Sequence, residues 1–300
     1  MEYRQLGNTG LEVSVLGLGG SSLGGVYRHV EIDEAIRCVH LAIDLGINLI
    51  DVSPCDGGKK AEKMLGLALR HVDRGRYTLM TKVGRYGANR FNYSSRRIKR
   101  SVDKSLSRLG ADVIDVIQCQ DIESAPIDQI VNETLPALET LRQKGKVRFI
   151  GVTGLPLRIF RDVLERAQVD TILSYCRHTL IDATLPTQLD YLLKKGVGII
   201  NAAPLSMGLL TNRGPTPLHP GGDAIRTACA AAADHCGAKG ADLAQLAIQF
   251  AVSNPRIHTT LVGTASPANI ERHVRWIEQP PDPELLTEVD RILKPIRGKD

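Results

Sequence analysis

The chain has 300 residues, of which 43% are hydrophobic and 24% charged, with a formal net charge of +5 at pH 7. This length suits either two ordinary domains or one α/β barrel, which needs about 250 residues. The modest charge, the 4% aromatic content and the lack of a known binding motif argue against nucleic acid as a partner. No apolar run is long enough to span a bilayer, so we expect no membrane segment.

The cysteines point to a reducing compartment. The six of them are spread singly along the sequence and form no Cys-x-x-Cys pair. No apolar signal region follows Met1. We therefore expect a reduced cytoplasmic protein whose partner is a small molecule, and the oligomeric state stays open.

The first predicted element is a hairpin over residues 3–15, with its turn at Gly7-Asn8-Thr9-Gly10. After it, runs rich in Val, Ile and Leu alternate with amphipathic stretches, as expected when strands are buried on both faces. The expected strands are 15–18, 48–51, 77–83, 113–120, 147–152, 171–175, 198–202 and 259–262. The expected helices are 32–45, 61–69, 94–109, 127–143, 157–167, 186–195 and 243–252.

Eight strand–helix alternations predict a closed (β/α)8 TIM barrel that spans residues 1–300 as a single domain. We expect the hairpin to cross its bottom, residues 213–223 to form a long loop, and residues 280–296 to add a C-terminal helix. The alternative is an open sheet, which normally binds a dinucleotide through a G-x-G-x-x-G turn after its first strand. The sequence at 17–22 departs from that pattern because its last position is Ser22.

Polar residues stand where several predicted strands end, which is where such barrels carry their chemistry. Asp51 ends the second strand, and Asp56 follows it in the next loop. Lys82 lies near the end of the third strand and Gln120 at the end of the fourth. A lysine on a buried strand needs an acidic partner, so we expect an ion pair between Asp51 and Lys82 at the mouth of the barrel.

Each of these residues also has a simpler interpretation. Asp51 can cap the next segment, Asp56 can favour a turn, and Gln120 can hydrogen-bond a neighbour. A metal site made from Asp51, Asp56 and Asp121 would lack the histidine spacing common in such sites, so we expect no metal.

Five segments together resemble the aldo-keto reductases, and most nearly the branch of the L-galactose dehydrogenases. The resemblance covers almost the whole chain. The segments are LGNTGL at 6–11, EKMLG at 62–66, GVTGLPL at 151–157, ILSYC at 172–176 and PLSMGLLT at 204–211.

The resemblance implies a catalytic set of Asp, Tyr, Lys and His. In that family the lysine, held by the aspartate, lowers the pKa of the tyrosine, and Tyr and His exchange a proton with the substrate oxygen while nicotinamide transfers a hydride. By position, Asp51 and Lys82 match this set, whereas Asp56 replaces the tyrosine and Gln120 replaces the histidine. A carboxyl titrates near pH ~4 and a phenol near pH ~10, so their protonation states at neutral pH are opposite.

The resemblance also implies NADP(H) as cofactor, in a partly altered pocket. Residues 204–209 resemble the loop for the pyrophosphate, and 262–267 the loop for the adenosine 2′-phosphate. Asn269 stands where the family often has a basic residue, although Arg272 can still supply positive charge. The candidate cofactor-binding residues are Ser174, Pro204, Leu205, Met207, Gly208, Leu209, Gly263, Thr264, Ser266 and Arg272.

Three functions remain open. The favoured hypothesis is an enzyme with a repurposed site, which performs non-redox acid–base chemistry such as elimination, isomerisation or cyclisation on a small polar or biosynthetic intermediate. Losing both proton-transfer groups should cripple ordinary reduction. The second is an NADP(H)-dependent oxidoreductase of a sugar-like alcohol or carbonyl with atypical proton transfer. The third is a non-catalytic binding barrel.

Overall fold

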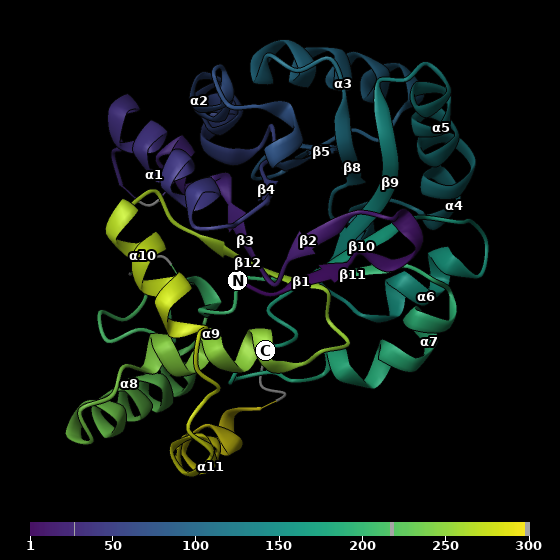
Figure 1. Cartoon of the computed structure of the whole chain (residues 1–300). Coiled ribbons are helices and arrows are strands. Elements are labelled where there is room, and N and C mark those ends of the chain that lie inside the picture. The colour runs from purple at the N-terminus through teal and green to yellow at the C-terminus, as the bar shows by residue number, and fades with distance from the viewer. Residues whose placement is uncertain (27, 217–218, 298–300) are drawn as a thin grey trace.

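A closed barrel of eight parallel strands forms the centre of the computed structural model, which describes residues 1–26, 28–216 and 219–297 (Figure 1). The hydrogen-bonded order around the barrel is β10-β11-β12-β3-β4-β5-β8-β9. The predicted TIM barrel is therefore confirmed. Its strands are β3 (Leu16–Gly19), β4 (Leu49–Asp51), β5 (Thr78–Val83), β8 (Ile114–Cys119), β9 (Val147–Gly154), β10 (Thr171–Tyr175), β11 (Gly198–Ala202) and β12 (Thr259–Gly263).

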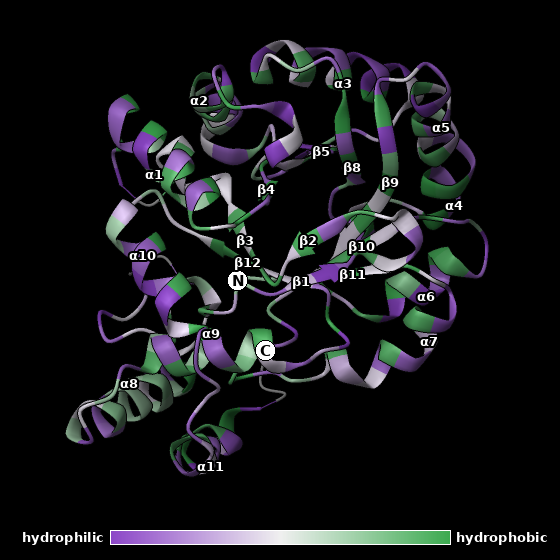
Figure 2. Ribbon diagram, in the orientation of Figure 1, coloured by the Kyte–Doolittle hydropathy of each residue, from purple (hydrophilic) through white to green (hydrophobic). Residues whose placement is uncertain are grey.

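Helices surround the barrel and bury one apolar face against it (Figures 1 and 2). The expected helix at 127–143 is interrupted by a π-helical turn, Ile130–Thr134. Pro136 explains the interruption, because it has no N–H to donate to the carbonyl one turn earlier. The surrounding helices are α1 (Ile32–Asp44), α2 (Lys60–Leu69), α3 (Ser95–Leu109), α4 (Ile127–Gln129), α5 (Leu135–Gln143), α6 (Arg158–Leu164), α7 (Leu189–Lys194), α9 (Leu243–Ser253) and α10 (Pro267–Trp276).

The predicted N-terminal hairpin closes the bottom of the barrel. Its strands, β1 (Tyr3–Gln5) and β2 (Glu12–Ser14), pair antiparallel and cross in front of the barrel strands in Figure 1. Leu6 and Val13 are fully buried in the cluster that fills the barrel interior. Arg4 donates through Nη1 to the backbone oxygen of Ile257, 2.6 Å away and just before β12. The hairpin therefore covers the N-terminal ends of the strands and leaves the opposite rim to the site.

Two helices lie outside the strand–helix alternation and pack on each other. The helix α11 (Pro283–Leu293) is the expected C-terminal helix, and it shares a buried cluster with α8 (Asp223–Ala238). Neither α8 nor α10 is among the helices that the sequence pattern predicts. In α8 the buried residues are small, such as Ala232 and Cys236, so the helix is pale in Figure 2 and lacks a stripe of large apolar side chains. No helix within the described ranges is long and apolar enough to cross a membrane.

Candidate functional site

An ion pair between neighbouring strands lies at the rim of the barrel. Asp51 ends β4, and Lys82 lies on β5, where its Nζ donates to Asp51 Oδ2 and, at 3.3 Å, to the backbone oxygen of Val52. The two side chains are only 8% and 10% exposed. Burial raises the pKa of Asp51, and the Lys82 charge opposes that shift. The predicted ion pair is thus confirmed, and the other Asp51 oxygen, Oδ1, is buried without a hydrogen-bond partner among the described residues.

Asp56 lies in the turn that follows β4, close to this pair. Its Oδ2 accepts a hydrogen bond of 2.8 Å from the backbone N–H of Ser53, as a turn-forming aspartate would. Burial raises the pKa of Asp56 to about 6, while Lys82 lowers it and Asp51 raises it. Asp56 therefore shapes the turn, as the simpler interpretation expects, and its raised pKa also suits a general base.

The turn is fixed by close backbone contact. Gly57 has a φ of +53°, and a Cβ at this position would lie 2.1 Å from the backbone oxygen of Gly24. Only glycine fits there. The backbone next to Asp56 is therefore held close to Gly24.

Gln120 directly follows β8. Its backbone N–H donates to Val83 at 2.8 Å, and its backbone oxygen accepts from the Tyr93 hydroxyl at 2.9 Å. Its side-chain Oε1 is buried and has no hydrogen-bond partner in the described part of the chain. A primary amide can donate or accept a hydrogen bond but does not titrate. Gln120 can thus bind a substrate oxygen without exchanging a proton with it.

A second polar cluster, which the sequence analysis does not assemble, occupies the same rim. Asp121 is buried, and Arg85 Nη1 donates to its Oδ2 at 2.6 Å. The hydroxyl of Tyr175, at the end of β10, donates to Asp121 Oδ1 at 3.2 Å. The signal available in the sequence is that each of these residues lies at or just beyond a strand end.

The structure does not bring Asp51, Asp56 and Asp121 together as a metal site. Asp51 pairs with Lys82, whereas Asp121 pairs with Arg85. Among residues 1–26, 28–216 and 219–297, no three His, Cys, Asp or Glu side chains are grouped to hold a metal ion.

A cleft of about 660 Å³ opens beside Asp51 and is lined by the loops after β3, β11 and β12. The candidate cofactor residues line it, with two exceptions. Ser174 is fully buried with an unpartnered Oγ, and Leu209 packs in the cluster shared by α8 and α11. Ser174 and Leu209 therefore do not line the cleft, whereas the remaining candidates do.

The backbone of the loop after β11 is strained. Ala203, Ser206 and Met207 all have left-handed conformations, with φ values of 58°, 47° and 51°. Such conformations are costly outside glycine and cluster where a protein clamps a ligand. The strain supports a ligand-binding role for this loop.

Cations outnumber carboxylates along the cleft. Arg28, Arg213 and Arg272 line it together with Asp51 and Asp242, and Arg28 is paired with Glu34. The helix α10 begins at its edge after Ser266. Arginine side chains and helix N-termini are common phosphate-binding groups. The volume, the cations and the strained loop together fit a dinucleotide such as NAD(P)(H).

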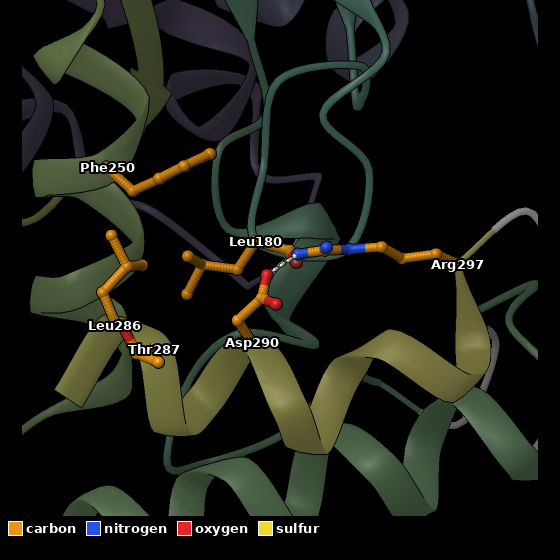
Figure 3. Close-up of a pocket in the computed structure, with 6 residues that line it drawn as sticks. All are labelled: Leu180, Phe250, Leu286, Thr287, Asp290 and Arg297. Atoms are coloured by element: carbon orange, nitrogen blue, oxygen red, sulfur yellow. Dashed lines mark hydrogen bonds and ion pairs between the residues drawn. The ribbon is translucent and has the colours of Figure 1, made fainter. Parts of the chain in front are cut away.

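A smaller cavity of about 200 Å³ lies away from the rim, between α9, α11 and the segment around Leu180 (Figure 3). Figure 3 shows Arg297 reaching back to Asp290, and the two form an ion pair of 2.5 Å. The other lining residues are Phe250, Leu286 and Thr287. Because its two charged lining groups are paired, this cavity offers less to chemistry than the rim does.

These features define the class of protein. It is a (β/α)8 barrel that carries a lysine–carboxylate ion pair beside a cleft large enough for a nucleotide. The sequence pattern of the Aldo/keto reductase family matches residues 15–294, and the chain belongs to this family.

Several known proteins resemble this chain. The L-galactose dehydrogenase of Arabidopsis thaliana is 46% identical over 307 aligned residues, which cover 99% of this chain and 96% of that protein. The D-arabinose 1-dehydrogenase of Saccharomyces cerevisiae is 33% identical and covers 80% of this chain and 76% of its own length. Among solved structures, the holo form of an aldo-keto reductase from Bacillus halodurans superimposes with a TM-score of 0.80 at 26% identity, covering 100% of this chain and 97% of that one.

Proposed function

We propose that this protein is an NAD(P)(H)-dependent dehydrogenase that oxidises a hydroxyl group of a small sugar-like substrate, with Asp56 as the proton acceptor. The observation that carries the proposal is the Asp56 carboxyl, whose pKa is raised to about 6 beside the Asp51–Lys82 pair. The adjoining cleft and the relatives named for sugar dehydrogenation support it. We place the redox hypothesis ahead of the non-redox one because the volume and the cations of the cleft suit a nicotinamide dinucleotide.

The residues divide the chemistry between them. Asp56 takes the proton from the substrate hydroxyl as the C=O bond forms, and Gln120 holds the same oxygen by a hydrogen bond. Lys82 favours the ionised form of Asp56, which is the form that accepts a proton. A nicotinamide cofactor, when bound, would accept the hydride that leaves the same carbon. The residues that would hold this cofactor are those of the loop at 203–208 together with Thr264, Ser266 and Arg272.

The site favours oxidation over reduction. At neutral pH Asp56 is mostly ionised, so it can accept a proton but seldom has one to donate. The hydroxyl of a cyclic hemiacetal, as at carbon 1 of an aldose, is more acidic than that of a simple alcohol. A weak carboxylate base therefore suits a sugar oxidised at carbon 1, and the product would be a lactone.

The test is an assay of the full chain with L-galactose and D-arabinose, with NAD⁺ or NADP⁺, following the formation of reduced nicotinamide. Turnover should depend on Asp56, so Asp56→Asn should lower it by at least about tenfold while still binding the cofactor. The pair Asp56→Tyr with Gln120→His should restore reduction of simple aldehydes. Calorimetry that detects neither NAD⁺ nor NADP⁺ binding would refute the proposal and favour a non-redox enzyme or a binding barrel.

A further inference from the structure

The second polar cluster is held rigidly at the rim. Arg85 begins a small hairpin made of β6 (Arg85–Gly87) and β7 (Arg90–Phe91), which directly follows β5. Its guanidinium donates to Asp121 at 2.6 Å and to the backbone oxygen of Ala88 at 3.2 Å, and it lies 5.5 Å from the centre of the Phe91 ring. The Arg85 side chain is nevertheless 32% exposed, so a ligand can reach it.

Asp121 ties this hairpin to two barrel strands, β9 and β10. Its backbone is left-handed, with a φ of 52°, and its N–H donates to Thr153 Oγ1 at 3.0 Å on β9. Its carboxylate accepts from Tyr175 on β10 as well as from Arg85. Such a network fixes the orientation of each side chain before any ligand arrives.

The cluster lies next to the reacting groups. Asp121 directly follows Gln120, and Arg85 lies three residues beyond Lys82. Burial raises the pKa of the Cys55 thiol, the charges of Arg85 and Lys82 oppose that rise, and those of Asp56 and Asp121 add to it. A substrate whose reacting carbon lies near Asp56 would therefore extend towards the cluster.

We propose that Arg85, Asp121 and Tyr175 form a subsite that binds substrate hydroxyls remote from the reacting carbon, and that this subsite selects an uncharged polyol over an acidic sugar. The inference rests on the proposed function for the position of the substrate. The charge of Arg85 is balanced by Asp121, so a sugar carboxylate would compete with Asp121 for the guanidinium. A neutral hydroxyl can use the guanidinium N–H groups that the existing contacts leave over, and it can donate to the Tyr175 oxygen.

The experiment compares two substrates that share the reacting group. L-galactose carries remote hydroxyls, whereas 2-hydroxytetrahydropyran is a cyclic hemiacetal without them. Arg85→Met and Tyr175→Phe should each lower kcat/KM for L-galactose by about 10- to 100-fold, mainly through KM, as expected for lost hydrogen bonds to a charged or buried partner. Turnover of 2-hydroxytetrahydropyran should be unchanged, because it makes none of these contacts.

Arg90→Met is the matched control, because Arg90 is an exposed arginine of the same hairpin. This change should leave kcat/KM for both substrates unchanged. An equal loss on both substrates in the Arg85 and Tyr175 variants would show that the cluster only supports the rim, and would overturn the inference. If Arg85→Met fails to fold, the conservative Tyr175→Phe still decides between the two outcomes.

A binding measurement separates this inference from the proposed function. Calorimetric titration of L-galactose and of its C6 carboxylate, L-galacturonate, into the protein with NADPH, which cannot accept a hydride, measures binding without oxidation at carbon 1. We expect L-galactose to bind at least about tenfold more tightly, and the preference to vanish in Arg85→Met. If L-galactose binds but is not oxidised, the proposed dehydrogenase activity is contradicted and the subsite is not. A uronate that binds equally well, or the failure of both sugars to bind, would contradict the subsite.

Discussion

Asp56 determines the pH dependence expected of this site. Burial raises the pKa of its carboxyl to about 6, and oxidation requires the ionised form. The value of kcat/KM should therefore rise with pH up to about 6 and level off above it. Asp56→Asn should remove this limb and lower turnover by at least about tenfold, towards the 10²–10⁴-fold range of general bases. A pH profile measured on both proteins checks this, and an unchanged limb in Asp56→Asn would assign the titration to another group.

The same carboxyl should cost the protein stability at neutral pH. Its pKa in the folded state lies above the unfolded value of about 4, so the folded state binds the proton more tightly. Stability contributed by this group is present below about pH 4 and is lost as the pH rises through about 6. Asp56→Asn keeps an acceptor for the Ser53 N–H and has no charge to bury. Its Tm at pH ~7 should exceed that of the unmodified protein, while its Tm at pH ~4 should match it.

The ion pair between Lys82 and Asp51 should contribute to the stability of the fold. Both side chains are almost fully buried, so Lys82→Met would leave the Asp51 carboxylate without its counter-charge. Loss of one partner from such a pair costs about 3–5 kcal/mol. The free energy of unfolding in urea should fall by that amount and recover largely in the double variant Lys82→Met with Asp51→Leu. No recovery would show that the loss arises from packing.

At the scale of elements, one buried glutamate joins two helices to the strand that carries Lys82. Glu62 on α2 is fully buried, accepts from Thr81 on β5 at 2.7 Å, and pairs with Arg108 on α3 at 2.5 Å. Arg108→Met should reduce the free energy of unfolding by about 3–5 kcal/mol, because it strands the Glu62 charge. Arg96→Met, an exposed change on the same helix, should have little effect. If both changes lower the free energy of unfolding equally, the loss does not come from the unpaired charge of Glu62.

The sequence predicts elements well where burial imposes a pattern. The barrel strands are apolar on both faces, so their positions follow from the sequence, and so does the Asp51–Lys82 pair at two neighbouring strand ends. The helix α8 is not predicted, because its buried face is made of Ala and Cys, and these small residues differ little in hydropathy from the rest of the helix. The cluster around Asp121 is not predicted, because it depends on contacts between the β6–β7 hairpin, the loop after β8 and the end of β10, and on one left-handed residue. No local pattern encodes such contacts.

At the scale of the whole molecule, the cleft draws residues from distant parts of the chain. Arg28 comes from the loop after β3, Arg213 from the loop after β11, and Arg272 from α10. Arg272 is the cation nearest in sequence to the expected 2′-phosphate loop at 262–267. Arg272→Ala should therefore raise the Kd of NADP⁺ by about tenfold or more and leave that of NAD⁺ within about twofold, as expected for one lost charge-assisted contact. Calorimetry with both cofactors checks this. Equal changes in the two Kd values would show that Arg272 contacts a group that NAD⁺ and NADP⁺ have in common.

The division between strand and loop at the rim has an evolutionary consequence. Asp51 and Lys82 lie within strands, whereas Asp56 and Gln120 lie just beyond the strand ends. In the genetic code, aspartate and tyrosine codons differ by a single base, and so do glutamine and histidine codons. Two point mutations therefore separate this rim from one with a tyrosine and a histidine, and neither touches the barrel that supports it. Two substitutions at the rim can therefore exchange a carboxyl and an amide for a phenol and an imidazole, while the buried Asp51–Lys82 pair and the barrel stay as they are.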